Sequence, residues 1–150
     1  MPLEKQLNED LKQAMKSGNA DKVGVLRMLN AALKNQAIAK GKDAVLTDEE
    51  VMQVLMREAK KRKESIEAFQ KGGRPEMAEK ERAELALLEI YLPKQMSREE
   101  VAKKVDEMIV TLRQAQGDVV FNNVMKAVMQ ELKGKADGKM ISEIVRKKLG

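Results

Sequence analysis

Apolar residues recur at steps of three and four positions along the whole of this chain, and this spacing limits its fold more than any other feature. Leu3, Leu7, Leu11 and Ala14 begin the pattern, which lines one face of a helix with apolar side chains. No segment sustains the strict alternation of apolar and polar residues that marks a half-buried strand. The sequence therefore predicts an all-α fold.

Interruptions in this pattern predict about seven helices. Thr47 with Glu50, and Ser97 with Glu100, have the spacing of a capping box, in which two residues three apart satisfy free amides at a helix start. Glycine and proline residues account for most other breaks. The expected helices cover approximately residues 3–16, 21–40, 48–70, 75–90, 98–116, 121–132 and 141–149.

Pro93 divides the predicted helices into two groups. A proline lacks the amide donor that the next helical turn needs, so the fourth helix is expected to end just before it. The second capping box then opens a new helix at Ser97. We expect an amino-terminal helical subdomain over residues 1–93 and a carboxy-terminal three-helix bundle over residues 97–150.

The chain carries few side chains that support catalysis. It contains no cysteine, histidine or tryptophan, which excludes Cys/His zinc sites, thiol nucleophiles and imidazole bases. Its serines are scattered, and the carboxylates at Glu76, Glu79, Glu81 and Glu84 are interleaved with basic residues, as on an exposed ion-paired helix face. We therefore expect no catalytic centre, no metal and no cofactor.

The sequence also carries a prediction about cellular location. No stretch of about 18 apolar residues is present to cross a bilayer, and the amino terminus does not resemble a signal peptide. The absence of cysteine fits a reducing compartment. These features predict a cytoplasmic protein with no membrane partner.

The positive charge of the chain is concentrated in two regions. Lysine and arginine outnumber aspartate and glutamate by 29 to 24, a mild excess that is compatible with nucleic-acid binding. Residues 57–63 and residues 133–150 each carry a net charge of +4, whereas residues 76–107 are acidic. We name residues 57–63 the basic run.

The basic run allows two interpretations. Its cations follow one helix at a spacing that suits a phosphate backbone. The alternative is a solvated face, in which Lys60 pairs with Glu64 and Lys63 pairs with Glu67.

Arg62 differs from the other cations of the basic run. It falls on the apolar line of its helix, and a buried guanidinium needs a carboxylate partner. We expect Arg62 to pair with Glu81 or Glu84 on the following helix, in a structural role.

A second candidate site is the loop of residues 133–139, which we name the lysine loop. It combines two glycines with three lysines immediately before a predicted helix start, where free amides and the helix dipole favour an anion. In the alternative interpretation Gly134 ends one helix, Asp137 caps the next, and the lysines are simply exposed. The residues by themselves favour neither interpretation.

Two separated stretches of the sequence resemble the GatB/YqeY family. They are Tyr91-Leu92-Pro93 with Gln95, and the segment GKADG at residues 134–138. The resemblance extends over essentially the whole chain and is to the free-standing YqeY type. It implies an all-helical protein whose last three helices are similar to the tail of the B subunit of tRNA-dependent amidotransferase. In that family the tail contacts tRNA, whereas amide transfer takes place in a separate preceding domain.

The sequence and this resemblance together predict a non-catalytic module that binds tRNA or associates with a tRNA amidotransferase. One alternative is a protein-interaction adaptor that docks on an aminoacyl-tRNA synthetase or an amidotransferase. Another, by family name only, is a carbon–nitrogen ligase with glutamine as amido donor. The residues expected to contact tRNA phosphates, or to shape the loop that does, are Lys133, Gly134, Lys135, Gly138, Lys139, Arg146, Lys147 and Lys148.

Overall fold

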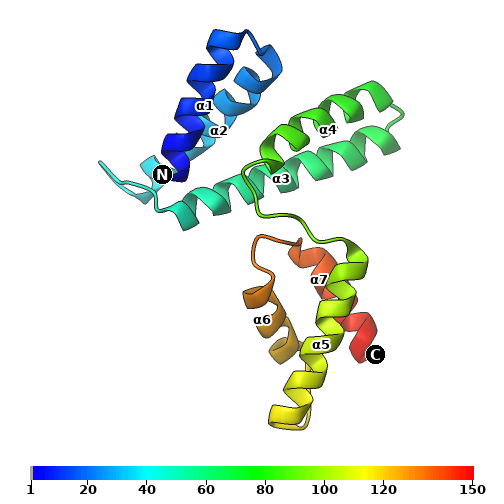
Figure 1. Cartoon of the computed structure of the whole chain (residues 1–150). Coiled ribbons are helices and arrows are strands. Elements are labelled where there is room, and N and C mark those ends of the chain that lie inside the picture. Colours follow the sequence, from blue (N-terminus) through cyan, green and yellow to red (C-terminus); the bar gives the residue numbers. More distant parts are fainter. Residues whose placement is uncertain (1) are drawn as a thin grey trace. The chain divides into compact units, whose positions relative to one another are not determined.

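A computed structural model describes residues 2–150, apart from the side chain of Gln116, and every regular element in that range is an α-helix (Figure 1). The predicted all-α fold is therefore confirmed. The helices are α1 (Leu3–Ser17), α2 (Ala20–Lys40), α3 (Asp48–Lys71), α4 (Pro75–Glu89), α5 (Arg98–Gln116), α6 (Phe121–Glu131) and α7 (Gly138–Leu149). In the same range, no helix is long and apolar enough to cross a membrane.

Side-chain caps start several of these helices. Both halves of the predicted capping box form at α3, and at α5 the Ser97 hydroxyl accepts a hydrogen bond from the Glu100 amide at 3.1 Å. The start of α2 was predicted one residue late. The Asn19 side chain accepts from the Lys22 amide at 3.2 Å, so Asn19 caps a helix that begins at Ala20.

The chain forms two compact units, Met1–Leu92 and Pro93–Gly150. In the first, the amino-terminal unit, α3 packs against α4, α1 packs against α2, and α2 contacts both α3 and α4. Apolar side chains from all four helices are buried together. The largest that are fully buried are Leu7, Leu26, Leu29, Leu33, Val51, Leu55 and Leu88. Burial of these side chains is the main stabilising contribution to this unit.

Arg62 is buried in the amino-terminal unit, with 8% of its surface exposed. Its Nη1 atom lies 3.0 Å from Glu81 Oε2 and 2.9 Å from Glu84 Oε2, and its Nη2 atom contacts the sulfur of Met28. The predicted pairing is therefore confirmed, with both carboxylates at once. Because the guanidinium lies between three helices, its role in this unit is structural.

Tyr91 joins the end of α4 to α1. Its side chain is buried, and its hydroxyl donates a hydrogen bond to Asp10 Oδ2 at 2.6 Å. Burial, together with this hydrogen bond to the Asp10 carboxylate, holds the pKa of Tyr91 well above its ordinary value. This residue of the family-like motif is thus part of the amino-terminal core.

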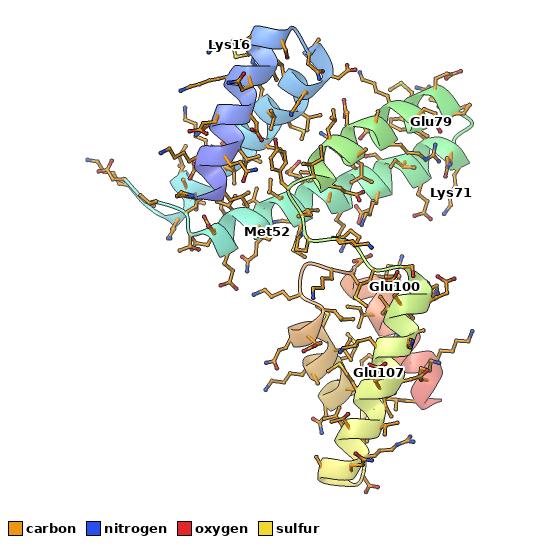
Figure 2. All side chains as sticks on the ribbon, in the orientation of Figure 1. Lys16, Met52, Lys71, Glu79, Glu100 and Glu107 are labelled. Atoms are coloured by element: carbon orange, nitrogen blue, oxygen red, sulfur yellow. The ribbon has the colours of Figure 1, made fainter. Side chains whose placement is uncertain are left out.

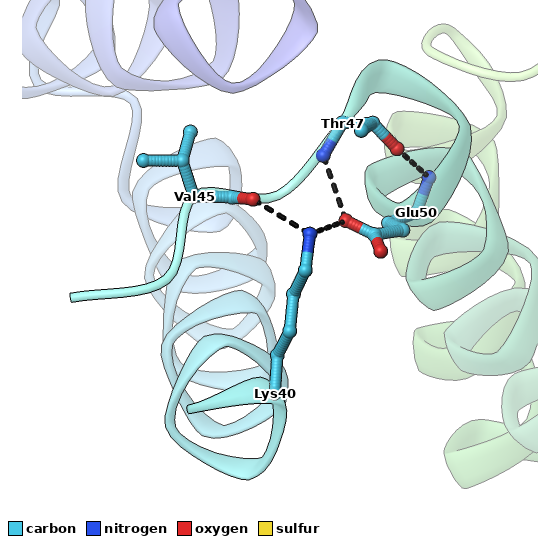
Figure 3. A network of polar contacts seen from close by, with 4 residues as sticks. All are labelled: Lys40, Val45, Thr47 and Glu50. Carbon is cyan, nitrogen blue, oxygen red and sulfur yellow. Dashed lines mark hydrogen bonds and ion pairs between the residues drawn. The ribbon is translucent and has the colours of Figure 1, made fainter. Parts of the chain in front are cut away.

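The connection between α2 and α3 is held by a small polar network (Figure 3). Lys40 Nζ donates to the Val45 carbonyl at 2.9 Å and to Glu50 Oε2 at 2.8 Å, and the Thr47 amide donates to the same carboxylate oxygen at 2.8 Å. The hydrogen bonds from Lys40 and then from Thr47 lower the pKa of Glu50. The network orients the connection so that Leu46 packs into the core.

The second unit, the carboxy-terminal unit, is a three-helix bundle in which α5, α6 and α7 contact one another pairwise. Its core is separate from that of the first unit and consists of aliphatic side chains, with Ala136 from the lysine loop. The fully buried members with the largest side chains are Val101, Val105, Val124, Val128 and Ile141. The lysine loop is therefore anchored by its own apolar residue.

Candidate functional site

The lysine loop turns its small residues inward and its lysines outward. Gly134 and Ala136 are buried, whereas Lys133, Lys135 and Lys139 are exposed. Gly134 has φ +81°, a left-handed conformation that a glycine adopts without steric cost. The Lys135 amide donates to the Leu132 carbonyl at 2.9 Å and closes the turn. The loop is thus a compact turn with basic side chains on its surface.

The segment Pro93–Ser97 is hydrogen-bonded to the lysine loop. Gln95 Nε2 donates to the Gly134 carbonyl at 2.7 Å and to the Pro93 carbonyl at 3.0 Å. The Met96 amide donates to the Lys135 carbonyl at 2.8 Å. The two stretches that carry the family resemblance therefore meet in space. Sequence reasoning noticed both stretches, but no spacing rule links residues about 39 positions apart.

The start of α7 is capped by its own chain. Asp137 Oδ1 accepts a hydrogen bond from the Lys139 amide at 3.3 Å, as an N-cap residue does. A carboxylate therefore already lies at the amino terminus of α7, the position where an anion would otherwise bind. Gly138 is the first helical residue, and a Cβ at this position would lie 3.5 Å from the Met129 methyl group, an ordinary contact. The exposed Lys135 and Lys139, rather than the helix terminus, are the groups that remain for an anion.

The cations of α7 differ in their surroundings. The Arg146 guanidinium lies over the ring of Phe121, 5.3 Å from its centroid. Lys148 Nζ lies 2.9 Å from Asp106 Oδ2 on α5. Both partners were missed from sequence, because they lie on other helices of the bundle. Arg146 and Lys148 thus contribute to the packing of this unit.

Three of the predicted site lysines have no ion-pair partner among the described residues. Within the described residues, Lys135, Lys139 and Lys147 form no ion pair, and all three are exposed. Glu143 lies between Lys139 and Lys147 at four-residue steps along α7, but it pairs with Arg98 at 3.4 Å. The bundle therefore presents unpaired positive charge at the lysine loop and at the last turn of α7.

Acidic and basic side chains are balanced along α5, which carries four of each. Glu100 and Glu107 lie on its exposed surface (Figure 2), and Asp106 provides the ion pair to α7 described above. Because α5 carries no net charge whereas residues 133–150 carry a net charge of +4, an anionic ligand would be attracted to residues 133–150 rather than to α5.

The lysines of the basic run do not form the ion pairs suggested for a solvated face. Among the described residues, Lys60 and Lys63 form no ion pair, and Glu67 pairs instead with Lys71 at 2.9 Å. The predicted Lys60–Glu64 and Lys63–Glu67 pairs are therefore wrong. A lysine that follows a glutamate by four residues pairs better on a helix than one that precedes it, which explains the preference for Lys71.

A shallow hollow between α2 and α3 adjoins the basic run. It has a volume of about 210 Å³ and is lined by polar groups of both helices, including Asn35, Gln36, Arg57, Glu58 and Lys61. Arg57 donates to Gln36 Oε1 at 3.1 Å, and Lys61 pairs with Glu58 at 3.3 Å. The Arg57–Gln36 hydrogen bond crosses the hollow, whereas the Lys61–Glu58 pair lies along α3. In the described part of the chain, no group of three or more acidic residues is placed to hold a metal ion.

Comparison with known proteins identifies the family. The family model described as Yqey-like protein matches residues 4–149. The chain belongs to this family. The Yqey-like chain is 28% identical over 147 residues to Altered inheritance of mitochondria protein 41, mitochondrial, of Pyrenophora tritici-repentis, a match that covers 96% of this chain and 79% of that protein. The protein of the same name in Eremothecium gossypii is 30% identical over 124 residues, which cover 81% and 67% of the two chains.

A shorter match confirms the resemblance to tRNA amidotransferases. A subunit of the glutamyl-tRNA(Gln) amidotransferase of Aeropyrum pernix is 41% identical over 59 residues, which cover 37% of the Yqey-like chain and 9% of that subunit. The similarity is thus limited to a small part of a much larger protein. The Yqey-like chain shares a module with this amidotransferase subunit, and the rest of the larger protein has no counterpart in the match.

The predicted cytoplasmic location is wrong by this comparison. The fungal relatives are named as mitochondrial proteins. The prediction depended on the absence of membrane-spanning and signal-peptide patterns and of cysteine, and these absences do not distinguish the cytoplasm from other reducing compartments.

Proposed function

We propose that this Yqey-like protein is a non-catalytic helical module that binds tRNA through its carboxy-terminal unit, residues 97–150. The observation that carries the proposal is the lysine loop, a compact turn whose exposed Lys135 and Lys139 have no ion-pair partner among the described residues. The similarity to a protein named as part of a glutamyl-tRNA(Gln) amidotransferase supports tRNA as the polyanion.

Recognition in this proposal depends on phosphate charge rather than on base stacking. The chain has only three aromatic residues, of which Tyr91 is buried and Phe121 lies against Arg146. Stacking of unpaired bases requires exposed aromatic rings. Lysine side chains instead bind phosphate oxygens, and such contacts position a protein on folded RNA without reading its sequence.

The predicted site residues have distinct roles in this proposal. Lys133, Lys135, Lys139 and Lys147 are the proposed phosphate contacts, and Gly134 gives the loop its turn. Gly138 begins α7 directly after the loop, and a Cβ there would make only an ordinary contact with Met129. Arg146 and Lys148 stand beside the contact surface and are already engaged within the bundle, so we assign them a smaller share of the binding energy.

A titration of tRNA at several salt concentrations tests the proposal. Each phosphate neutralised on duplex-like RNA contributes about −0.9 to the slope of log K against log salt. The variant Lys135→Glu/Lys139→Glu should lose affinity and slope, whereas Lys34→Glu/Lys42→Glu, with the same change in net charge in the amino-terminal unit, should retain both. A flat slope for the unmodified chain, or no binding at about 50 mM salt, would contradict the proposal.

A second candidate function is docking on a tRNA amidotransferase or an aminoacyl-tRNA synthetase. The similarity to part of an amidotransferase also favours this candidate. The same charge reversal separates the two. Loss of tRNA retention with intact protein binding supports tRNA contact, and the opposite result supports docking. Glutamine-dependent amide transfer by the purified chain would contradict the non-catalytic part of the proposal.

A further inference from the structure

The side-chain amide of Gln95 occupies a central place beside the lysine loop. Its Nε2 atom is 2.7 Å from the Gly134 carbonyl and 3.0 Å from the Pro93 carbonyl, so its two N–H groups have one acceptor each. One acceptor belongs to the lysine loop and the other to the segment that carries Gln95. The amide therefore bridges two pieces of backbone that have no regular secondary structure.

The backbone on either side of Lys135 is held at three points. The Lys135 amide donates to the Leu132 carbonyl at 2.9 Å, the Lys135 carbonyl accepts from the Met96 amide at 2.8 Å, and Gln95 holds the preceding carbonyl. The Lys135 side chain itself is exposed and unpaired. Because the backbone of Lys135 is already ordered, less conformational entropy is lost when its side chain binds a phosphate.

We propose that Gln95 is a positioning residue for the phosphate contacts of the lysine loop, acting through the carbonyl of Gly134. This inference rests on the proposed tRNA-binding function. Gln95 contributes no charge and contacts no ligand in this assignment. It keeps the turn in the conformation in which Gly134 and Ala136 face inward and Lys135 faces outward.

A positioning role of Gln95 can be recognised from the salt dependence of tRNA binding. If the turn loses its conformation, Lys135 no longer neutralises a phosphate, and fewer counterions are released. Gln95→Met keeps the length of the side chain and removes both hydrogen-bond donors. Although this substitution changes no charge, it should lower the salt slope because the turn that positions Lys135 is lost. The expected decrease is about 0.9, which is a loss of affinity of roughly eightfold at 0.1 M salt.

The experiment compares the full chain with Gln95→Met, Lys135→Ala and the double variant, each titrated with one tRNA transcript at four salt concentrations. The inference predicts that both single variants lower the slope by a similar amount and that the double variant lowers it little further. Gln114→Met, an exposed position on α5, serves as the control for the substitution itself and should keep the original slope.

The outcomes separate this inference from the proposed function. An unchanged slope in Gln95→Met overturns the positioning role, even where Lys135→Ala lowers the slope and so supports tRNA binding by the loop. A slope that falls independently in the two variants, with additive effects in the double variant, also overturns it. A flat slope in the unmodified chain removes the proposed function and this inference together.

Hydrogen exchange distinguishes a displaced loop from an unfolded unit. In Gln95→Met the amides of Met96 and Lys135, which donate within this contact region, should exchange faster while the α5 and α7 core amides stay protected. If the core amides lose protection as well, Gln95→Asn is titrated in its place. Its amide is one methylene short of bridging both carbonyls, and the same slopes decide the result.

Discussion

The two basic regions of this protein, residues 57–63 and residues 133–150, have the same net charge by sequence and different structures. In the basic run on α3, Arg62 is buried against two carboxylates and Lys61 pairs with Glu58. In the lysine loop, the turn is formed by backbone hydrogen bonds, and Lys135 and Lys139 have no ion pair among the described residues. The comparison shows that a count of charges does not identify a binding surface. A binding surface depends on how many of the charged side chains are left without an ion-pair partner in the folded protein.

The largest expected effect tests the structural role of the basic run. Arg62→Ala leaves Glu81 and Glu84 without their partner, and breaking a buried pair in this way destabilises a protein by about 3 kcal/mol or more. Urea unfolding of the amino-terminal unit measures this change. Lys60→Ala, an exposed position on the same helix, should change the free energy of unfolding by less than about 0.5 kcal/mol. Equal effects of the two variants would remove the distinction between buried and free cations.

The next effect concerns the lysine loop. Lys135→Ala/Lys139→Ala removes two proposed phosphate contacts, so the salt slope for tRNA should fall by about 1.8. At 0.1 M salt this corresponds to a loss of affinity on the order of 60-fold, or about 2.4 kcal/mol. The unfolding free energy should change little, because both side chains are exposed. A variant that binds tRNA with the original slope would contradict the assignment of this loop.

A smaller effect is expected from the free cations of the basic run. Lys60→Ala/Lys63→Ala removes the same amount of charge as the loop variant, from positions that are also exposed and unpaired in the described structure. If tRNA contacts only the carboxy-terminal unit, the salt slope should fall by less than about 0.3. A decrease comparable to that of the loop variant would show that both basic regions contact RNA.

The smallest effect concerns an exposed ion pair, as a counterpart to the buried pairs of Arg62. The pKa of Glu50 is lowered by its hydrogen bonds to Lys40 and Thr47. The ionised carboxylate therefore stabilises the fold at pH values above the ordinary pKa of a glutamate side chain. This contribution is lost as the pH falls through the lowered folded pKa. Melting temperatures of the unmodified chain and of Glu50→Gln should therefore differ slightly at pH 7 and converge toward pH 3. A constant difference over this range would contradict the pH linkage.

Much of the fold could be predicted because its signals are local. The capping box at Thr47 and Glu50 predicted the start of α3, since both partners lie within one helical turn. The position of Arg62 on an apolar line predicted its carboxylate partners, because burial leaves a guanidinium few alternatives. The start of α2 was missed by one residue, since Asp21 suits the first turn of a helix and only the observed hydrogen bond shows that Asn19 is the N-cap.

The candidate site was predictable only in part. The cluster of lysines and glycines at residues 133–139 is visible in the sequence, and so is the capping capacity of Asp137. The stacking of Arg146 on Phe121 and the pairing of Lys148 with Asp106 were not predicted. Both depend on how three helices face one another, and the apolar stripes do not determine which exposed side chains then become neighbours.

By itself, the sequence determined the seven helices, their approximate ends and the two basic regions, because helix formation and capping depend on residues three or four positions apart. Only the tertiary structure decided which lysines remain unpaired and that Gln95 and Met96 hold the turn of the lysine loop. The physical reason is distance along the chain. A hydrogen bond between residues about 39 positions apart exists only after the bundle has packed, so it leaves no periodic trace in the sequence.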